Sequence, residues 1–258
     1  MPSVRGDLSD AMRNIKLVLS YDGSEFNGWQ TQPGFRTVQE TVESAIAVIT
    51  QEAPIRLNAS GRTDSGVHAV GQVANFRTAS NLLCERFLRG INANLPDDVA
   101  VLSAEEKHES FDANRDAVRK LYRYVIHDGP VAMPFLRKYV ARSRHPLDAS
   151  AMARAARCLV GTHDFRCFET EWPNRATSVR TITHLQINRF GDHIWLDVEA
   201  DGFLYNMVRA IAGTLMNVGR GYWPESQPQA ILEAGDRTLA GPTAPAEGLF
   251  LMRVAYEA

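Results

Sequence analysis

The chain is organised around the polar stretch Ala59-Ser60-Gly61-Arg62-Thr63-Asp64-Ser65-Gly66-Val67-His68, which separates two segments with strand-like composition, 55–59 and 70–76. Two glycines bracket a single carboxylate, Asp64, and glycines let a chain turn tightly and let another molecule approach the backbone. A loop that carries Arg, Asp and His between two strands is typical of a functional site. The spacing alone fits an ordinary turn equally well, with Asp64 bonded to its own backbone.

The composition is that of an ordinary soluble globular protein. The 258 residues suffice for one large domain or two modest ones, and 45% are hydrophobic and 22% charged. The net charge of −2 gives no overall sign of a polyanionic partner. No apolar run approaches the roughly 20 residues of a membrane span, so no membrane association is expected. The N-terminus is polar without a signal-peptide core, and residues 1–13 are expected to be a frayed extension.

The cysteines predict a reduced protein. Cys84, Cys158 and Cys167 are odd in number and show no CxxC spacing, which favours a cytoplasmic protein without a disulfide framework. Cys158, His163 and Cys167 lack a fourth partner for a structural zinc site, so no metal is expected.

Basic residues are concentrated in one part of the chain. Residues 115–144 contain only two acidic side chains, Asp116 and Asp128, and several aromatic ones, among them Tyr122 and Tyr124. A basic, aromatic stripe on a nearly neutral protein predicts a nucleic-acid contact surface, with a charged strand edge as the alternative. The basic residues are Arg115, Arg119, Lys120, Arg123, Arg137, Lys138, Arg142 and Arg144.

Hydrophobic periodicity predicts the same order of elements twice. The first half is predicted as strand 15–21, helix 38–49, strands 55–59 and 70–76, helix 82–91 and strand 99–104; Thr37-Val38-Gln39-Glu40 has the form of a capping box. The second half is predicted as strand 121–127, helix 148–160, strands 178–190 and 193–200, helix 204–218, a short helix 228–233 and strand 249–254.

This order indicates an α+β fold with two ferredoxin-like β-α-β-β-α-β halves, residues 14–108 and 109–258. Two such halves with antiparallel sheets can pair edge to edge and leave a cleft between them. The Asp64 loop would then lie near the cleft, and the second half would contribute the basic strand and the helix with Arg209.

Several motifs, in order, resemble the TruA family of tRNA pseudouridine synthases over nearly the whole chain. The main one is Gly61-Arg62-Thr63-Asp64-Ser65-Gly66-Val67-His68. The others are Phe26-Asn27-Gly28-Trp29-Gln30, Arg36-Thr37-Val38-Gln39, Lys120-Leu121-Tyr122-Arg123-Tyr124, Gly161-Thr162-His163-Asp164-Phe165, Phe203-Leu204-Tyr205-Asn206-Met207-Val208-Arg209 and Thr243-Ala244-Pro245-Ala246-Glu247-Gly248-Leu249.

The resemblance implies a pseudouridine-synthase-type cleft and the conversion of uridine to pseudouridine at positions 38–40 of the tRNA anticodon stem-loop, by a homodimer and without a cofactor. Asp64 would be the catalytic carboxylate and Arg209 its partner. A cation beside Asp64 is expected to lower its pKa and keep it ionised. Arg62 would help to flip the target base, Tyr122 would stack on uracil and take part in proton transfer, and Leu249 would pack on the other side.

One segment departs from the family pattern. Other matching residues imply contacts with RNA. Phe111-Asp112-Ala113-Asn114 stands where the family often has Phe-His-Ala-Arg, so contacts with RNA are expected to differ there. Arg119, Lys120 and Arg123 belong to the matching basic strand and are expected to contact RNA.

Two other functions fit parts of the sequence. A glycosidase or base hydrolase also uses a carboxylate near C1′, but it needs a second carboxylate a few ångströms away, and the Asp64 motif offers none. A non-catalytic RNA-binding module would need aromatic residues on its sheet surfaces and would not require glycines on both sides of Asp64. Incubation with tRNA separates the three functions by their product: free uracil, pseudouridine or neither.

Overall fold

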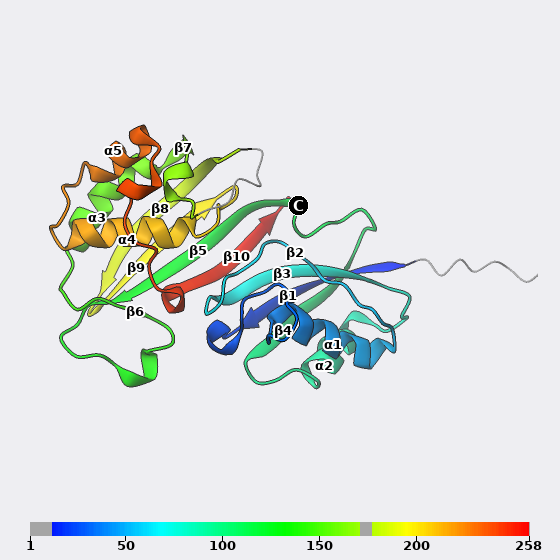
Figure 1. Ribbon diagram of the computed structural model, residues 1–258. Coiled ribbons are helices and arrows are strands. Elements are labelled where there is room, and N and C mark those ends of the chain that lie inside the picture. Colours follow the sequence, from blue (N-terminus) through cyan, green and yellow to red (C-terminus); the bar gives the residue numbers. More distant parts are fainter. Residues whose placement is uncertain (1–11, 171–176, 258) are drawn as a thin grey trace, which may run out of the picture.

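The computed structural model describes residues 12–170 and 177–257, which form a mixed α+β structure around one open sheet (Figure 1). Its strands run in the order β4-β1-β3-β10-β5-β9-β8-β7, with β2 beside β3 and β6 beside β5. The strands are β1 (Arg13–Tyr21), β2 (Asn58–Ala59), β3 (His68–Thr78), β4 (Val99–Lys107), β5 (Ala117–His127), β6 (Ala141–Arg142), β7 (Gly161–Asp164), β8 (Val179–Phe190), β9 (His193–Ala200) and β10 (Leu249–Tyr256). The α-helices of the described residues are α1 (Val38–Thr50), α2 (Cys84–Asn92), α3 (Ala149–Ala156), α4 (Met207–Gly219) and α5 (Gln227–Ala234).

Strand β10 joins the two halves of the molecule. It pairs in parallel with β3, at Phe250–His68 and Leu251–Ala69, and antiparallel with β5 on its other side. The approach of β10 to β3 requires a glycine, because a Cβ atom at Gly71 would lie 2.6 Å from the carbonyl oxygen of Met252. The halves therefore share one mixed sheet, in place of two antiparallel sheets. The ferredoxin-like description of each half and the cleft between them stay predictions.

All five helices of the described chain pack on the same face of this sheet. In the first half the buried side of β1 carries Ile15, Leu17 and Leu19, and the ring of Phe76 meets that of Phe87 on α2 edge-on at 5.7 Å. Since paired residues of neighbouring strands point to the same face, the pairing of Leu251 with Ala69 continues this face into the second half. One buried hydrophobic cluster consequently runs beneath the helices of both halves.

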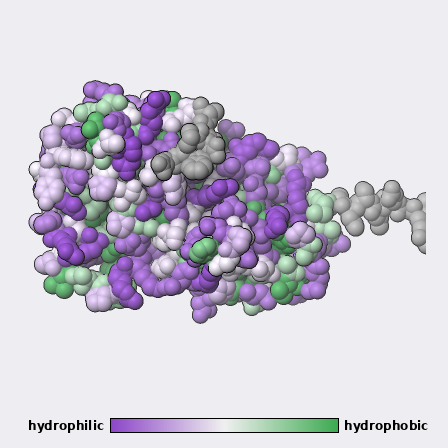
Figure 2. Space-filling view, viewed as in Figure 1, coloured by the Kyte–Doolittle hydropathy of each residue, from purple (hydrophilic) through white to green (hydrophobic). Residues whose placement is uncertain are grey.

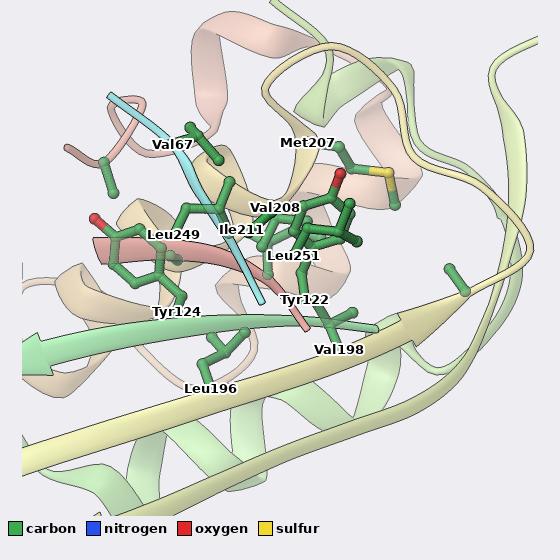
Figure 3. Packing of buried hydrophobic residues seen from close by; sticks show 14 of the residues in the cluster. Val67, Tyr122, Tyr124, Leu196, Val198, Met207, Val208, Ile211, Leu249 and Leu251 are labelled. Atoms are coloured by element: carbon green, nitrogen blue, oxygen red, sulfur yellow. The ribbon is translucent and has the colours of Figure 1, made fainter. Parts of the chain in front are cut away.

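In the second half, helix α4 covers β5 and β10. Figure 3 shows Val208 and Ile211 of α4 grouped with Tyr122, Leu249 and Leu251, all of which belong to the buried cluster. The side chains of Val208 and Ile211 are one turn apart, as expected for an apolar helix stripe. This packing sets the position of the first turn of α4, which carries Arg209.

Several predicted boundaries are wrong for local reasons. The strand expected at 55–59 is reduced to β2, and α4 begins at Met207 instead of 204 because Asn206 adopts a left-handed conformation (φ 59°). The predicted capping box is absent: Thr37 precedes α1, but its buried hydroxyl has no hydrogen-bond partner among the described residues. The frayed N-terminal extension was predicted for residues 1–13, of which residues 1–11 lie outside the described residues.

On the face shown in Figure 2, hydrophilic residues dominate and hydrophobic ones are scattered among them. Within residues 12–170 and 177–257, no helix has the length and apolar character needed to cross a bilayer.

Candidate active site

The loop that carries Asp64 packs against the loop that follows β1. The Trp29 backbone N–H donates to the carbonyl oxygen of Thr63 (3.0 Å), and a Cβ atom at Gly28 (φ +81°) would lie 2.7 Å from the same oxygen. Gly66 has a positive φ (+78°), a backbone conformation that favours glycine, whereas Gly61 does not. The two sequence motifs around Trp29 and Asp64 thus form one structural unit.

Buried side-chain hydrogen bonds further fix the first part of this loop, residues 60–63. The hydroxyls of Tyr21 and Thr63 are 2.8 Å apart in the protein interior. Gln72 of β3 is fully buried; its Oε1 accepts from the hydroxyl of Ser60 (2.6 Å), and its Nε2 donates to the carbonyl oxygen of Gly61 (2.9 Å). Because buried polar groups are costly to leave unpaired, these bonds restrict the loop to one conformation.

Asp64 forms an ion pair with Arg209 from the first turn of α4. The Arg209 Nη1 lies 3.2 Å from Asp64 Oδ2, and the side chains are 17% and 27% exposed respectively. Nη1 also donates to Asn206 Oδ1 (2.8 Å), and Nε donates to the carbonyl oxygen of Ala244 (2.7 Å). Partners on two sides therefore hold the guanidinium group in front of Asp64, although the two residues come from different halves of the chain.

Burial outweighs the ion pair in its effect on Asp64. Desolvation raises the pKa of the Asp64 carboxyl group above its ordinary value, while the charge and hydrogen bond of Arg209 act in the opposite direction. The expectation that the neighbouring cation gives Asp64 a lowered pKa is wrong in direction. Arg209 limits the increase and so helps Asp64 to remain ionised.

Tyr122 lies on β5, on the same face as the Asp64 loop. Its side chain is 9% exposed, and its ring meets that of Phe203 edge-on at 5.0 Å. Within the described chain, its hydroxyl has no hydrogen-bond partner. Burial, followed by the nearby Tyr21 and Asp64, raises its pKa, so the hydroxyl stays protonated at neutral pH and can donate a hydrogen bond.

Leu249 opens β10 beside these residues. It is 6% exposed and pairs with Tyr124, whose buried ring donates its hydroxyl hydrogen to the carbonyl oxygen of Pro245 (2.8 Å). Figure 3 shows Leu249 among Val67, Tyr124 and Ile211. The structure thus brings four of the predicted site residues, Asp64, Tyr122, Arg209 and Leu249, to one region of the sheet.

Of the predicted RNA-contacting residues, Arg62 and Lys120 lie at the Asp64 loop, whereas Arg119 and Arg123 do not. Arg62 is exposed in the Asp64 loop and has no ion pair or hydrogen bond with any described residue. Successive strand residues point to opposite faces, so Arg119 and Arg123 lie on the face opposite to Lys120 and Tyr122.

Carboxylates from other elements offset much of the basic stripe. Arg123 forms two hydrogen bonds with Asp197 (2.7 and 2.8 Å) and lies over the ring of Trp195. Arg119 lies 3.9 Å from Glu199. Lys138 pairs with Glu25 at 2.5 Å. Acidic side chains from outside residues 115–144 therefore neutralise part of the positive charge that the sequence places in this stretch.

Sequence reasoning missed the residues that hold the site together. The site is held by contacts of Asn206 with Arg209, of Gln72 with Gly61 and of Tyr21 with Thr63. These contacts depend on strand register and on helix geometry, which sequence spacing does not show. Asn206 was within a quoted motif, but its contact with Arg209 depends on its left-handed backbone.

No metal centre accompanies the site in the described part of the chain, because no three His, Cys, Asp or Glu side chains are grouped as ligands there. The carboxylates of the adjacent loop have other partners. Asp22 accepts from the Tyr139 hydroxyl (2.7 Å), and Glu25 pairs with Lys138. Asp64 is therefore the carboxylate that the site itself presents.

Comparison with known proteins assigns the family. The sequence model of a family described as tRNA pseudouridine synthase matches residues 17–114 and 155–257. The chain is 42% identical over 245 residues to tRNA pseudouridine synthase A of Thermoanaerobacter sp. (strain X514), and 44% identical over 245 residues to that of Acetivibrio thermocellus; each match covers 95% of this chain and 100% of the relative.

A solved structure of a Cbf5-Nop10-Gar1 complex is also similar, with a TM-score of 0.34 and 12% identity over 92% of this chain and 57% of that one, which is too slight a likeness to support an argument. The family match and the two relatives confirm the prediction of an isomerase of this kind. The chain belongs to the tRNA pseudouridine synthase family.

Proposed function

We propose that this protein converts uridine to pseudouridine at positions 38–40 of the tRNA anticodon stem-loop, with Asp64 as the catalytic carboxylate. The observation that carries the proposal is the pairing of a recessed Asp64 with Arg209 across the two halves, 3.2 Å apart, in a loop fixed by buried hydrogen bonds. A carboxylate held in one position beside a cation is suited to act on an electrophilic ribose carbon.

The reaction is an isomerisation in which every atom of the base is retained except one exchanged hydrogen. The bond from N1 to C1′ breaks, the uracil turns, and C5 forms a new bond with C1′. The hydrogen on C5 leaves as a proton, and N1 takes up another. Asp64 either attacks C1′ or assists departure of the base and then moves the C5 proton, and the geometry is compatible with both routes.

Tyr122 and Leu249 are proposed to hold the uracil between them. The protonated Tyr122 hydroxyl has no protein partner among the described residues, so it is available to the base. Leu249 offers an apolar surface beside Tyr124. A target base must leave its stack before it reaches such a site, at a cost of a few kcal/mol. Arg62 is exposed, lies two residues from Asp64 in the same loop and has no partner in the described ranges 12–170 and 177–257, and we propose that it fills the gap that the flipped base leaves.

Contacts with the remainder of the tRNA are proposed to be electrostatic. Arg119 is the more open of the two arginines on the far face of β5, with 54% of its side chain exposed against 25% for Arg123. Phosphate contacts of this kind position an RNA without reading its sequence. Lys120 and Arg123 were predicted to share the role, and both have protein partners in the structure.

Assembly and location are part of the same proposal. We propose a homodimer, as the family resemblance implies, located in the cytoplasm. The three cysteines are all free thiols in the structure, which is compatible with a reducing compartment. Sedimentation of the purified chain tests the dimer directly: a monomer at micromolar concentration would contradict it.

Product analysis tests the reaction. The wild-type protein is incubated with uridine-containing tRNA, and nucleosides are separated after digestion. Pseudouridine at positions 38–40 is the expected product. Free uracil would indicate a glycosidase, and unchanged tRNA that remains bound would indicate an RNA-binding module. An anticodon stem-loop in which these three uridines are replaced by cytidine provides the matched control.

A further inference from the structure

The side chain of Lys120 connects two strands that are not neighbours. Its ammonium group donates to the carbonyl oxygen of Ser60 at 2.5 Å, at the start of the Asp64 loop. Lys120 belongs to β5, whereas the backbone N–H of Ser60 bonds to Val73 of β3, and β10 lies between these strands. The lysine therefore reaches across the strand that joins the halves.

The sequence spacing on β5 makes this contact relevant to the site. Lys120 and Tyr122 are two residues apart and point to the same face. One strand thus places Tyr122 beside the site and, through Lys120, holds the loop that carries Asp64. The lysine lies close to the loop backbone, since a Cβ atom at Gly61 would lie 3.3 Å from the Lys120 ammonium nitrogen, which would have to shift by a few tenths of an ångström.

We propose that Lys120 is a positioning residue that fixes the Asp64 loop relative to Tyr122, and that it does not bind tRNA phosphate. A hydrogen bond with a charged donor is stronger than a neutral one and is suited to hold a backbone carbonyl in place. Gln72 holds Gly61 from the β3 side, at its carbonyl oxygen, while Lys120 holds Ser60 from the β5 side. The start of the loop is thereby fastened to both halves.

This proposal rests on the proposed function, and steady-state kinetics on tRNA test it. Lys120→Met is expected to lower kcat by about 10²-fold while KM changes little, because a displacement near 1 Å in reacting groups costs about that factor. Lys120→Arg keeps a charged donor and is expected to recover part of kcat. Lys107→Met is the matched control, since Lys107 lies on β4 and pairs with Glu105 at 2.6 Å; its kinetics are expected to match wild type.

The salt dependence of tRNA binding separates positioning from phosphate contact. A lysine that contacts phosphate contributes about one to the slope of log Kd against log salt, so its loss would reduce the slope by about one. Lys120→Met is expected to leave the slope unchanged. A reduced slope with wild-type kcat would overturn the proposal and make Lys120 an RNA contact.

A second variant covers a failure of Lys120→Met to fold. Gly61→Ala retains the lysine but introduces a methyl group against its ammonium. It is expected to lower kcat by roughly tenfold without a matching rise in KM, as for a loss felt only in the transition state. Wild-type kcat in Gly61→Ala would contradict the positioning role. If the wild-type protein itself forms no pseudouridine, the proposed function fails; if it does and the variants match it, only the role of Lys120 fails.

Discussion

The two faces of β5 carry basic residues of similar chemistry in different settings. On the face toward the helices, Lys120 and Tyr122 border the Asp64 loop, and the lysine contacts a backbone carbonyl. On the opposite face, Arg119 and Arg123 lie near carboxylates of the adjacent strand β9. The strand places four residues of the short stretch 119–123 on opposite sides of the sheet.

The difference shows that a cluster in sequence is not a cluster in space. Successive side chains of a β-strand point to opposite faces, so residues that are adjacent in sequence lie on opposite sides of the sheet. One face is therefore expected to determine turnover, and the other to influence stability and the outer contacts of the RNA. Substitutions on the two faces test this division.

The largest effect is expected for Asp64→Asn, which keeps the size of the side chain and removes the charge. Pseudouridine formation is expected to fall by at least about 10³-fold, as for loss of a catalytic nucleophile. tRNA affinity is expected to persist, because phosphate contacts elsewhere supply most of it. Release of tritium from 5-tritiated uridine tRNA measures the rate, and a near wild-type rate would remove Asp64 from the mechanism.

The stability of Asp64→Asn sharpens this result. The folded-state pKa of Asp64 is raised, so its ionised form costs stability above that pKa, and the cost disappears below the unfolded pKa. Removing the charge relieves this cost but leaves Arg209 without its carboxylate partner. The two effects oppose each other, so the melting temperature at neutral pH is expected to change little.

On the same face, Tyr122→Phe separates stacking from the hydroxyl. The ring and its contact with Phe203 remain, so tRNA affinity is expected to be retained. Turnover is expected to fall by about 10²–10⁴-fold if the hydroxyl assists proton transfer. A variant that turns over at the wild-type rate would restrict Tyr122 to a stacking role.

The pH profile tests the electrostatic balance at Asp64. In the proposed mechanism turnover requires the ionised Asp64 carboxylate, so its raised pKa is expected to make activity decline on acidification at a higher pH than for an ordinary aspartate. Arg209→Met removes the group that opposes this increase, so the acidic limb of kcat is expected to move to still higher pH. An unchanged limb would show that another group controls it.

The smallest effect on turnover is expected on the far face, for Arg123→Met. Its kcat is expected to stay within about twofold of wild type, while the loss of a partly buried ion pair lowers the free energy of unfolding by up to about 1 kcal/mol. Urea unfolding measures the second quantity, and Asp197→Asn serves as the matched change in its partner. A large fall in kcat with unchanged stability would show that both faces of β5 serve the reaction.

The sequence allowed the α+β class and most element types to be predicted, and it pointed to Asp64 and Arg209, which the structure brings together. Alternation in β1 and the apolar stripe of α4 were sufficient for those elements, and Asp64, Arg62 and Arg209 came from the family motif. The prediction of a strand at 55–59 was wrong for most of its length, because only Asn58 and Ala59 pair with β3. The predicted direction of the Asp64 pKa shift was wrong because the sequence shows a neighbouring charge but not how deeply the carboxyl group is buried.

The contacts that support the Asp64 loop could not be predicted from the sequence, for a physical reason. Gln72 resembles any polar residue within a strand until pairing places it beneath Ser60 and Gly61. Lys120 is one of eight basic residues in its stretch, and only the register across β10 distinguishes it from its neighbours. Such roles arise from contacts between residues far apart in sequence.

The central place of β10 has a consequence for how the protein is made. This strand is the last of the described elements to leave the ribosome, yet it lies in the middle of the sheet, as Figure 1 shows. Chains grow from the N-terminus, and pairing between distant segments is slow to form. A nascent chain can therefore form the other strand pairs of each half first, but it can bring Asp64 and Tyr122 into register only after residues 249–256 have been synthesised and inserted between β3 and β5.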